Sequence, residues 1–183
     1  MIYLSKGLLQ ERHGGAVTVN RHGRAVTLHG TQARDWLEGR HGPQYRSKTR
    51  IRELAAMGLV EAQPGESYAL DVFRALCNCI LTPYPKRFSY MGLNEREKDT
   101  LRWLTLAGLR LTAAELVRLS ELGLKPETGY LGEDNRQRLV EAIYCADNIE
   151  DGALEAQMEK SIALAATVSA VLTLVKKKRI VLL

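Results

Sequence analysis

The strongest chemical signal in this sequence is a run of basic residues between positions 40 and 52. Lys or Arg occupies five of these 13 positions, and no Asp or Glu interrupts them. Basic side chains neutralise phosphates, and Arg can bond to guanine through two hydrogen bonds. We therefore predict a DNA-binding surface made of Arg40, Gln44, Arg46, Lys48, Thr49, Arg50 and Arg52. The alternative is a solvated basic face of the kind that many soluble proteins carry.

A helix beginning at Ser47 would position this surface. If the helix directs Ile51, Leu54 and Ala55 into a core, then Lys48, Thr49 and Arg52 point outward near its first turn. This is where a recognition helix presents donors to the major groove, with Arg40 and Arg46 near phosphates and Gln44 near a base edge or a phosphate. The sequence therefore predicts double-stranded DNA as the partner.

Other reactive residues do not form a recognisable site. Cys77 and Cys79 are separated by one residue, whereas paired zinc ligands are usually two to four residues apart, so a buried thiol fits them better. Asp35 and Glu38 share one face of a predicted helix, but nothing nearby indicates a raised pKa. Gly14 and Gly15 lack the Lys-Ser/Thr ending of a phosphate-binding loop. We expect no enzyme activity, no metal and no cofactor.

Composition and charge narrow the class of protein. The 183 residues are 45% hydrophobic and 26% charged, which excludes a disordered chain. Residues 1–91 hold 13 Lys and Arg against 7 Asp and Glu, whereas residues 92–183 hold 13 against 14. An anionic partner is therefore expected on the N-terminal half. Three cysteines, no secretory signal and no apolar stretch long enough for a membrane span predict a cytoplasmic protein that does not bind membranes.

Hydrophobic periodicity predicts the elements of the N-terminal half. Residues 16–20 and 24–28 alternate apolar and polar side chains around a short turn with glycine, which is typical of a β-hairpin. Further strands are expected at residues 2–4 and 59–62, and helices at 32–38, 47–58 and 68–81. The proline-containing segment that follows indicates a linker. We predict domains at residues 1–82 and 92–183, joined by a linker at 83–91.

The C-terminal half is predicted to be helical almost throughout. Asn94 with Glu97, and Thr112 with Glu115, have the spacing of capping boxes at helix starts. Another helix is expected at residues 133–146 and a strand at 180–183. The apolar residues between 151 and 175 fit either one long helix or two helices broken near Ser161. They also fit either a buried core or the seam of a homodimer.

Two segments share one plan, which carries a family resemblance. Aligning Leu59 and Val60 with Ile180 and Val181 superposes Ile51 on Leu172 and Leu54 on Val175. In both segments, a short helix and a turn lead to a second helix and then an apolar strand. This order is similar to the helix-turn-helix of winged-helix proteins.

The resemblance implies a mainly α fold with small β-hairpins, arranged as tandem winged-helix-like units. It also implies a DNA-binding protein with the function of a transcriptional regulator. The alternative is a protein or peptide-interaction module without nucleic-acid binding, because some small winged-helix domains recognise peptides. In that case a peptide strand would add to the hairpin edge formed by residues 16–20.

Overall fold

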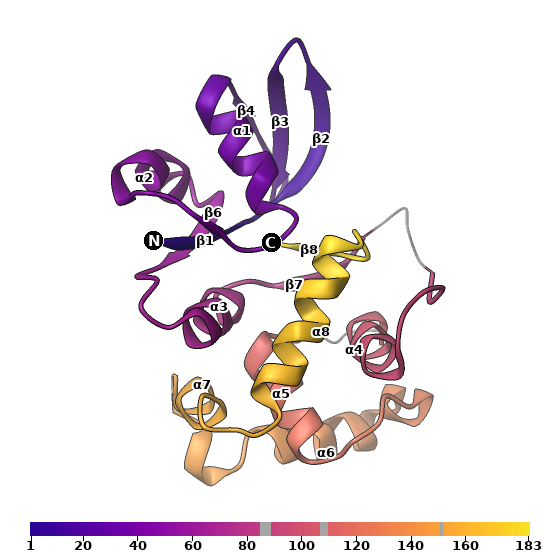
Figure 1. The fold of residues 1–183 in the computed structure, drawn as a ribbon. Coiled ribbons are helices and arrows are strands. Elements are labelled where there is room, and N and C mark those ends of the chain that lie inside the picture. The colour runs from indigo at the N-terminus through magenta and orange to yellow at the C-terminus, as the bar shows by residue number, and fades with distance from the viewer. Residues whose placement is uncertain (85–88, 107–109, 151) are drawn as a thin grey trace.

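The computed structural model describes residues 1–84, 89–106, 110–150 and 152–183. It is 49% helical and 19% strand, with three small antiparallel sheets. The prediction of a mainly α fold is therefore wrong, and the fold is mixed α/β (Figure 1). The strands are β1 Ile2–Ser5, β2 Leu8–His13, β3 Ala16–Arg21, β4 Arg24–Leu28, β5 Gln44–Tyr45, β6 Val60–Gln63, β7 Leu81–Pro83 and β8 Ile180–Leu182.

The α-helices fall before and after the predicted linker. Two 3₁₀ turns, Thr128–Leu131 and Ala146–Asn148, flank α6. Four residues of the predicted linker, 85–88, lie outside the described residues. The α-helices are α1 Gly30–Gly39, α2 Lys48–Ala56, α3 Tyr68–Cys77, α4 Glu95–Thr105, α5 Ala113–Glu121, α6 Glu133–Ile143, α7 Ala153–Met158 and α8 Leu164–Lys176.

Strand β1 lies between two hydrophobic cores. It is completely buried and pairs with β5 on one side and β6 on the other. Because successive side chains of a strand point to opposite faces, Ile2 and Leu4 enter the larger core and Tyr3 enters the smaller one. The larger core contains α3 and the C-terminal helices, whereas the smaller one contains α1, α2 and the β2–β3–β4 sheet.

The β2–β3–β4 sheet confirms the predicted hairpin and adds a strand to it. His22 and Gly23 have φ angles of 51° and 82°, which suits the tight turn between β3 and β4. Val17 and Val19 are buried in the smaller core. Strand β2 was not predicted because its last four residues are exposed and carry no apolar alternation. β3 is consequently the central strand of this sheet.

The helices of the N-terminal half follow most of the predicted pattern. Ser47 is the N-cap residue of α2, and Ile51 and Leu54 are buried as expected, but Ala55 is exposed. Helix α1 begins at Gly30, two residues earlier than predicted, so its N-cap residue is His29. Both helices present one apolar face to the smaller core.

The C-terminal half confirms the local helix signals. Both predicted capping boxes are present, at the starts of α4 and α5. The apolar segment is broken into α7 and α8 around Ser161, which was one of the two predicted alternatives. Met158 and Val175 are buried in the larger core, whereas Ile162 is 97% exposed. The core interpretation thus holds for part of this segment.

The pairing of the last strand, β8, differs from what two repeated segments of similar plan would predict. β8 pairs with β7, so residues 81–83 are joined to residues 180–182. In contrast, β6 pairs with β1 at the other end of the sequence. The two segments of similar plan therefore end in different sheets. The strand at the end of each segment pairs with a strand that lies outside both segments.

Candidate functional site

The seven residues predicted to bind DNA lie along the segment from the end of α1 to the middle of α2. Arg40 follows α1, Gln44 is in β5, and Arg46 lies just before the N-cap of α2. Lys48, Thr49, Arg50 and Arg52 are exposed residues of α2. The chain thus brings these residues to one region, but their side chains have different environments.

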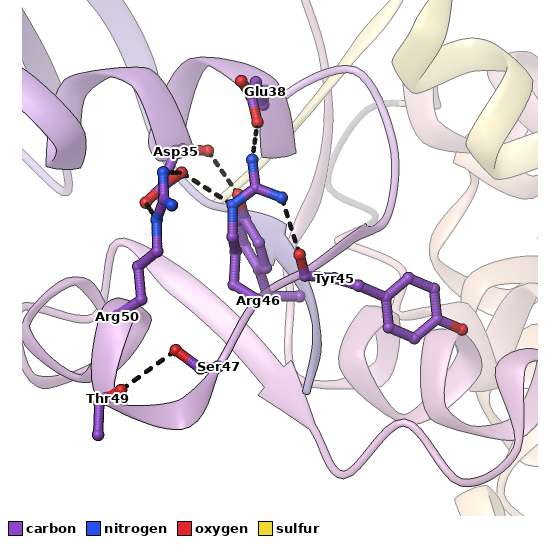
Figure 2. A network of polar contacts seen from close by, with 8 residues as sticks. Asp35, Glu38, Tyr45, Arg46, Ser47, Thr49 and Arg50 are labelled. Atoms are coloured by element: carbon purple, nitrogen blue, oxygen red, sulfur yellow. Dashed lines mark hydrogen bonds and ion pairs between the residues drawn. The ribbon is translucent and has the colours of Figure 1, made fainter.

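Two of the predicted DNA contacts are bound to a buried carboxylate (Figure 2). The Asp35 side chain is 1% exposed, and it accepts hydrogen bonds from Arg46 Nε at 3.0 Å and Arg50 Nε at 2.6 Å. Arg50 Nη2 donates a further bond at 2.8 Å. Burial by itself raises the pKa of Asp35, but the hydrogen bonds from Arg50 and Arg46 outweigh it and hold the pKa below its usual value. Asp35 is therefore ionised and compensates this pair of guanidinium groups.

Arg46 has two further partners in the same network. It forms an ion pair with Glu38 and donates to the Tyr45 carbonyl oxygen at 2.8 Å. Its guanidinium group is thereby held by two acceptors of α1 and one of β5. Because all three acceptors belong to the protein itself, Arg46 connects α1 to the start of α2, and its charge is already compensated by Asp35 and Glu38.

Arg40 is also engaged within the protein. Its guanidinium carbon lies 5.0 Å from the centre of the Trp36 ring, which is a cation–π contact. Burial lowers the pKa of Arg40, and a side-chain hydrogen bond with Tyr84 acts in the opposite direction. Arg40 therefore faces the junction of α1 with the C-terminal strand, away from the exposed side of α2.

Lys48, Thr49 and Arg52 remain as the exposed part of the predicted surface. Thr49 Oγ1 lies 3.1 Å from Ser47 Oγ, within hydrogen-bond distance. No ion pair of Lys48 or Arg52 occurs within the described part of the chain. These two cations and one hydroxyl are a smaller surface than the seven residues predicted.

A groove that the sequence analysis did not anticipate lies between the β3–β4 hairpin and the end of α2. It has a volume of about 450 Å³. Its lining residues are Arg21, His22, Arg24, Val26, Ala56, Met57 and Leu59. The first three are basic and the last four are apolar. The hairpin and the helix end that line this groove are about 30 residues apart in sequence, so no local sequence pattern predicts the groove.

The free edge of β4 borders this groove. Within the described residues, β4 is hydrogen-bonded to β3 alone, whereas β3 has partners on both sides. The expectation that residues 16–20 form an open edge is therefore wrong, because β2 covers that edge. The edge available on this side of the sheet belongs to β4, the next strand of the predicted hairpin.

Arg21 lies across the groove beside the end of α2. A Cβ atom added at Gly58 would come within 1.6 Å of Arg21 Nη1, so the guanidinium group rests against this glycine. Gly58 has a φ angle of +67° and ends the helix. Arg21 Nε is buried and has no hydrogen-bond partner within the described residues. A buried donor without an acceptor is a place where a ligand oxygen would be stabilising.

Comparisons of the chain with protein-family models, with curated proteins and with solved structures gave no match. The described residues contain no group of three or more His, Cys, Asp or Glu side chains arranged to hold a metal ion. Nor do they include a helix whose length and hydrophobicity would let it cross a membrane.

Proposed function

We propose that this protein is a peptide-binding module that takes up an extended segment as a fourth strand beside β4. The observation that carries the proposal is that the open edge of β4 borders a groove lined by both apolar and basic side chains. Strand addition uses main-chain hydrogen bonds for affinity and pockets for alternate side chains for specificity. This groove offers both features.

The hairpin register identifies the backbone groups that would bind the added strand. Arg21 pairs with Arg24 across the two-residue turn, and Asn20 pairs with Ala25. In an antiparallel ladder, hydrogen-bonded and non-bonded pairs alternate, and the pair that closes such a turn is a bonded one. The N–H and C=O groups of Ala25 and Thr27 consequently face away from β3, toward the added strand.

The groove also indicates the chemistry of the peptide. Val26 is partly buried and Leu59 is fully buried, while Met57 is 38% exposed. Apolar side chains of the peptide would cover the exposed parts of Val26 and Met57 and remove them from water. Arg21 and Arg24, on either side of the β3–β4 turn, favour a carboxylate. We therefore expect a peptide that alternates apolar residues and carries an acid near the β3–β4 turn.

Peptide display tests this proposal with two variants of a single residue. The immobilised protein is used to select from a library of random ten-residue peptides, and the most enriched peptide is then labelled for fluorescence anisotropy. Ala25→Pro removes one outward N–H group. Ala25→Val keeps that group and suits a strand, so it is the matched control.

We expect Ala25→Pro to weaken the selected peptide on the order of tenfold, since it loses one hydrogen bond and gains a steric conflict. Ala25→Val should stay within about threefold of the original affinity. Circular dichroism establishes that both variants fold. The proposal is refuted if no peptide is enriched, or if Ala25→Pro binds the enriched peptide as tightly as the original chain does.

Binding of double-stranded DNA stays a prediction, with Lys48, Thr49 and Arg52 as its exposed residues. Replacing Arg50 would leave the Asp35 carboxylate with fewer partners, so the informative variant is Lys48→Glu with Arg52→Glu. Anisotropy of a labelled duplex should weaken linearly with salt on logarithmic axes if phosphates are contacted. An affinity that the double variant leaves unchanged would exclude this surface.

A further inference from the structure

A second pocket lies where the end of α1 meets the C-terminal strand. Its walls come from four parts of the chain: Ser5 and Gly7 at the end of β1, Arg40 and His41 after α1, five residues between Val175 and Leu182, and Tyr84. A hydrogen bond from the Gly7 N–H to the Leu182 carbonyl oxygen, at 2.7 Å, joins the first part to the third. The pocket therefore exists only in the folded chain.

Two cationic side chains and one imidazole line this pocket, and its lining residues include no carboxylate. Arg40, His41 and Lys178 all line it. None of the three has an ion pair within the described residues. Burial lowers the pKa of His41, and the charges of Lys178 and Arg40 lower it further. Arg40 is half-buried, whereas His41 and Lys178 are exposed. An anion would compensate the partly desolvated charge of Arg40.

Lys178 is held in a backbone conformation that normally requires glycine. Helices α2, α5 and α8 end with the same two hydrogen bonds, from the last residues of the turn back to the final helical carbonyls. In α2 and α5 the residue with positive φ is glycine, Gly58 and Gly123, each at +67°. In α8 it is Lys178, at +55°. A lysine at such a position costs stability, which points to a use for its ammonium group.

Ser5 adds an unsatisfied hydroxyl group to the same pocket. It is 4% exposed, and its Oγ has no hydrogen-bond partner within the described residues. A buried hydroxyl usually has a partner, so a ligand oxygen would complete it. The pocket thus combines the cations of Arg40 and Lys178, the His41 imidazole, one hydroxyl group without a protein partner and a mouth open to solvent.

We propose that this pocket binds a phosphate group, either inorganic phosphate or the terminal phosphate of a small monoester. A dianion matches the excess of positive charge better than a monovalent carboxylate, and Arg forms paired hydrogen bonds with phosphate oxygens. The pocket has a volume of about 20 Å³. This volume holds about one water-sized group, so one phosphate oxygen would enter the pocket and the rest of the anion would lie at its mouth, between the exposed side chains of His41 and Lys178.

A bound phosphate would link the residue pair after α1 to the turn after α8. These two segments are more than 130 residues apart in sequence, and the phosphate would bridge their charges. Because it binds the folded chain alone, it would also raise the thermal stability of the protein. The site shares no lining residue with the groove beside β4, so the two proposals stand or fall separately.

Isothermal titration calorimetry with inorganic phosphate tests the site, at a total ionic strength kept constant with sodium chloride. Lys178→Gly is the informative variant, because glycine suits the φ angle of this residue and removes the ammonium group without endangering the fold. Lys176→Ala removes one positive charge from the exposed end of the same helix and is the matched control. Titrations with acetate and with a phosphate monoester, phosphoserine, distinguish the ligand classes.

We expect one phosphate per chain, binding weakened about tenfold or more by Lys178→Gly, and little change in Lys176→Ala. Acetate should bind more weakly than phosphate. Phosphoserine binding more tightly than phosphate assigns the site to monoesters, and the reverse order assigns it to the free ion. The proposal is overturned if phosphate binds no better than chloride, or if both lysine variants weaken it equally.

Discussion

Replacing Gly39 by alanine is a sensitive test of how α1 is seated on β1. Gly39 is the last residue of α1 and is buried. A Cβ atom there would lie 2.4 Å from Ser5 Oγ, 2.7 Å from Tyr3 Cε2 and 3.2 Å from the Ser5 backbone nitrogen. The first two distances are shorter than real Cβ contacts, and the third involves a strand that is paired on both sides.

Two effects of opposite sign decide the result of Gly39→Ala. Alanine is favoured over glycine within a helix by at most about 1 kcal/mol. Against this, an extra methyl group in a closely packed interior typically costs about 1–3 kcal/mol when the surroundings must move. The contacts involve the buried Tyr3 ring and the backbone of β1, which have little room to shift. We therefore expect a net loss of stability of about 1–2 kcal/mol.

Urea unfolding followed by circular dichroism measures this loss, and a double-mutant cycle locates its cause. Ser5→Ala removes the nearest atom, an Oγ without a partner, so we expect Gly39→Ala to cost less in the Ser5→Ala background by about 0.5–1 kcal/mol. If Gly39→Ala leaves the protein as stable as before, or more stable, then α1 does not approach β1 as described. That result would also move Arg40, the next residue, away from the phosphate pocket.

Three further predictions concern single side chains. Asp35→Asn should destabilise the chain by more than Glu38→Gln does in urea unfolding. Since the pKa of Asp35 is lowered on folding, its stabilisation is present above the usual aspartate value of 3.8 and lost as the pH falls below it, so the variant should show a flatter acid branch. Lys178→Gly should raise the unfolding free energy by about 0.5–1 kcal/mol because it relieves a positive φ angle, and an unchanged or lower value would contradict that strain. Burial raises the pKa of the Cys79 thiol to about 12, so this group should react with a disulfide reagent at neutral pH only when the chain unfolds.

The sequence predicted those elements whose signals are local. The β3–β4 hairpin and the capping boxes at Asn94 and Thr112 each depend on residues within a few positions of one another. Strands β2, β5 and β7 were not predicted, because each is defined mainly by its partner. β5 is only two residues long and pairs with β1, about 40 positions earlier. With these strands left out, the chain was interpreted as more helical than it is.

The difference between local signals and contacts with distant residues also explains why Arg46 and Arg50 of the predicted DNA-binding site are bound to acids of the protein itself. Arg46 and Arg50 belong to a basic run without an acid, yet Asp35 and Glu38 of the preceding helix approach them in space. The two acids share one face of the predicted helix, but no sequence pattern indicates the distance between that face and the later arginines. Only the packing of α1 beside α2 shows that this part of the basic run is compensated inside the protein.

The two proposed binding sites use cations that have no ion pair within the described residues, and these cations lie at two separate places. Arg24 lies at the groove beside β4, whereas Lys178 lies at the pocket behind α1. Because the two sites share no lining residue, saturating phosphate should leave the affinity of a selected peptide unchanged when ionic strength is held constant. Anisotropy of the labelled peptide, with and without phosphate, measures this directly. Displacement of the peptide by phosphate, but not by chloride, would mean that both ligands use the same cations and that the separation of the two sites is wrong.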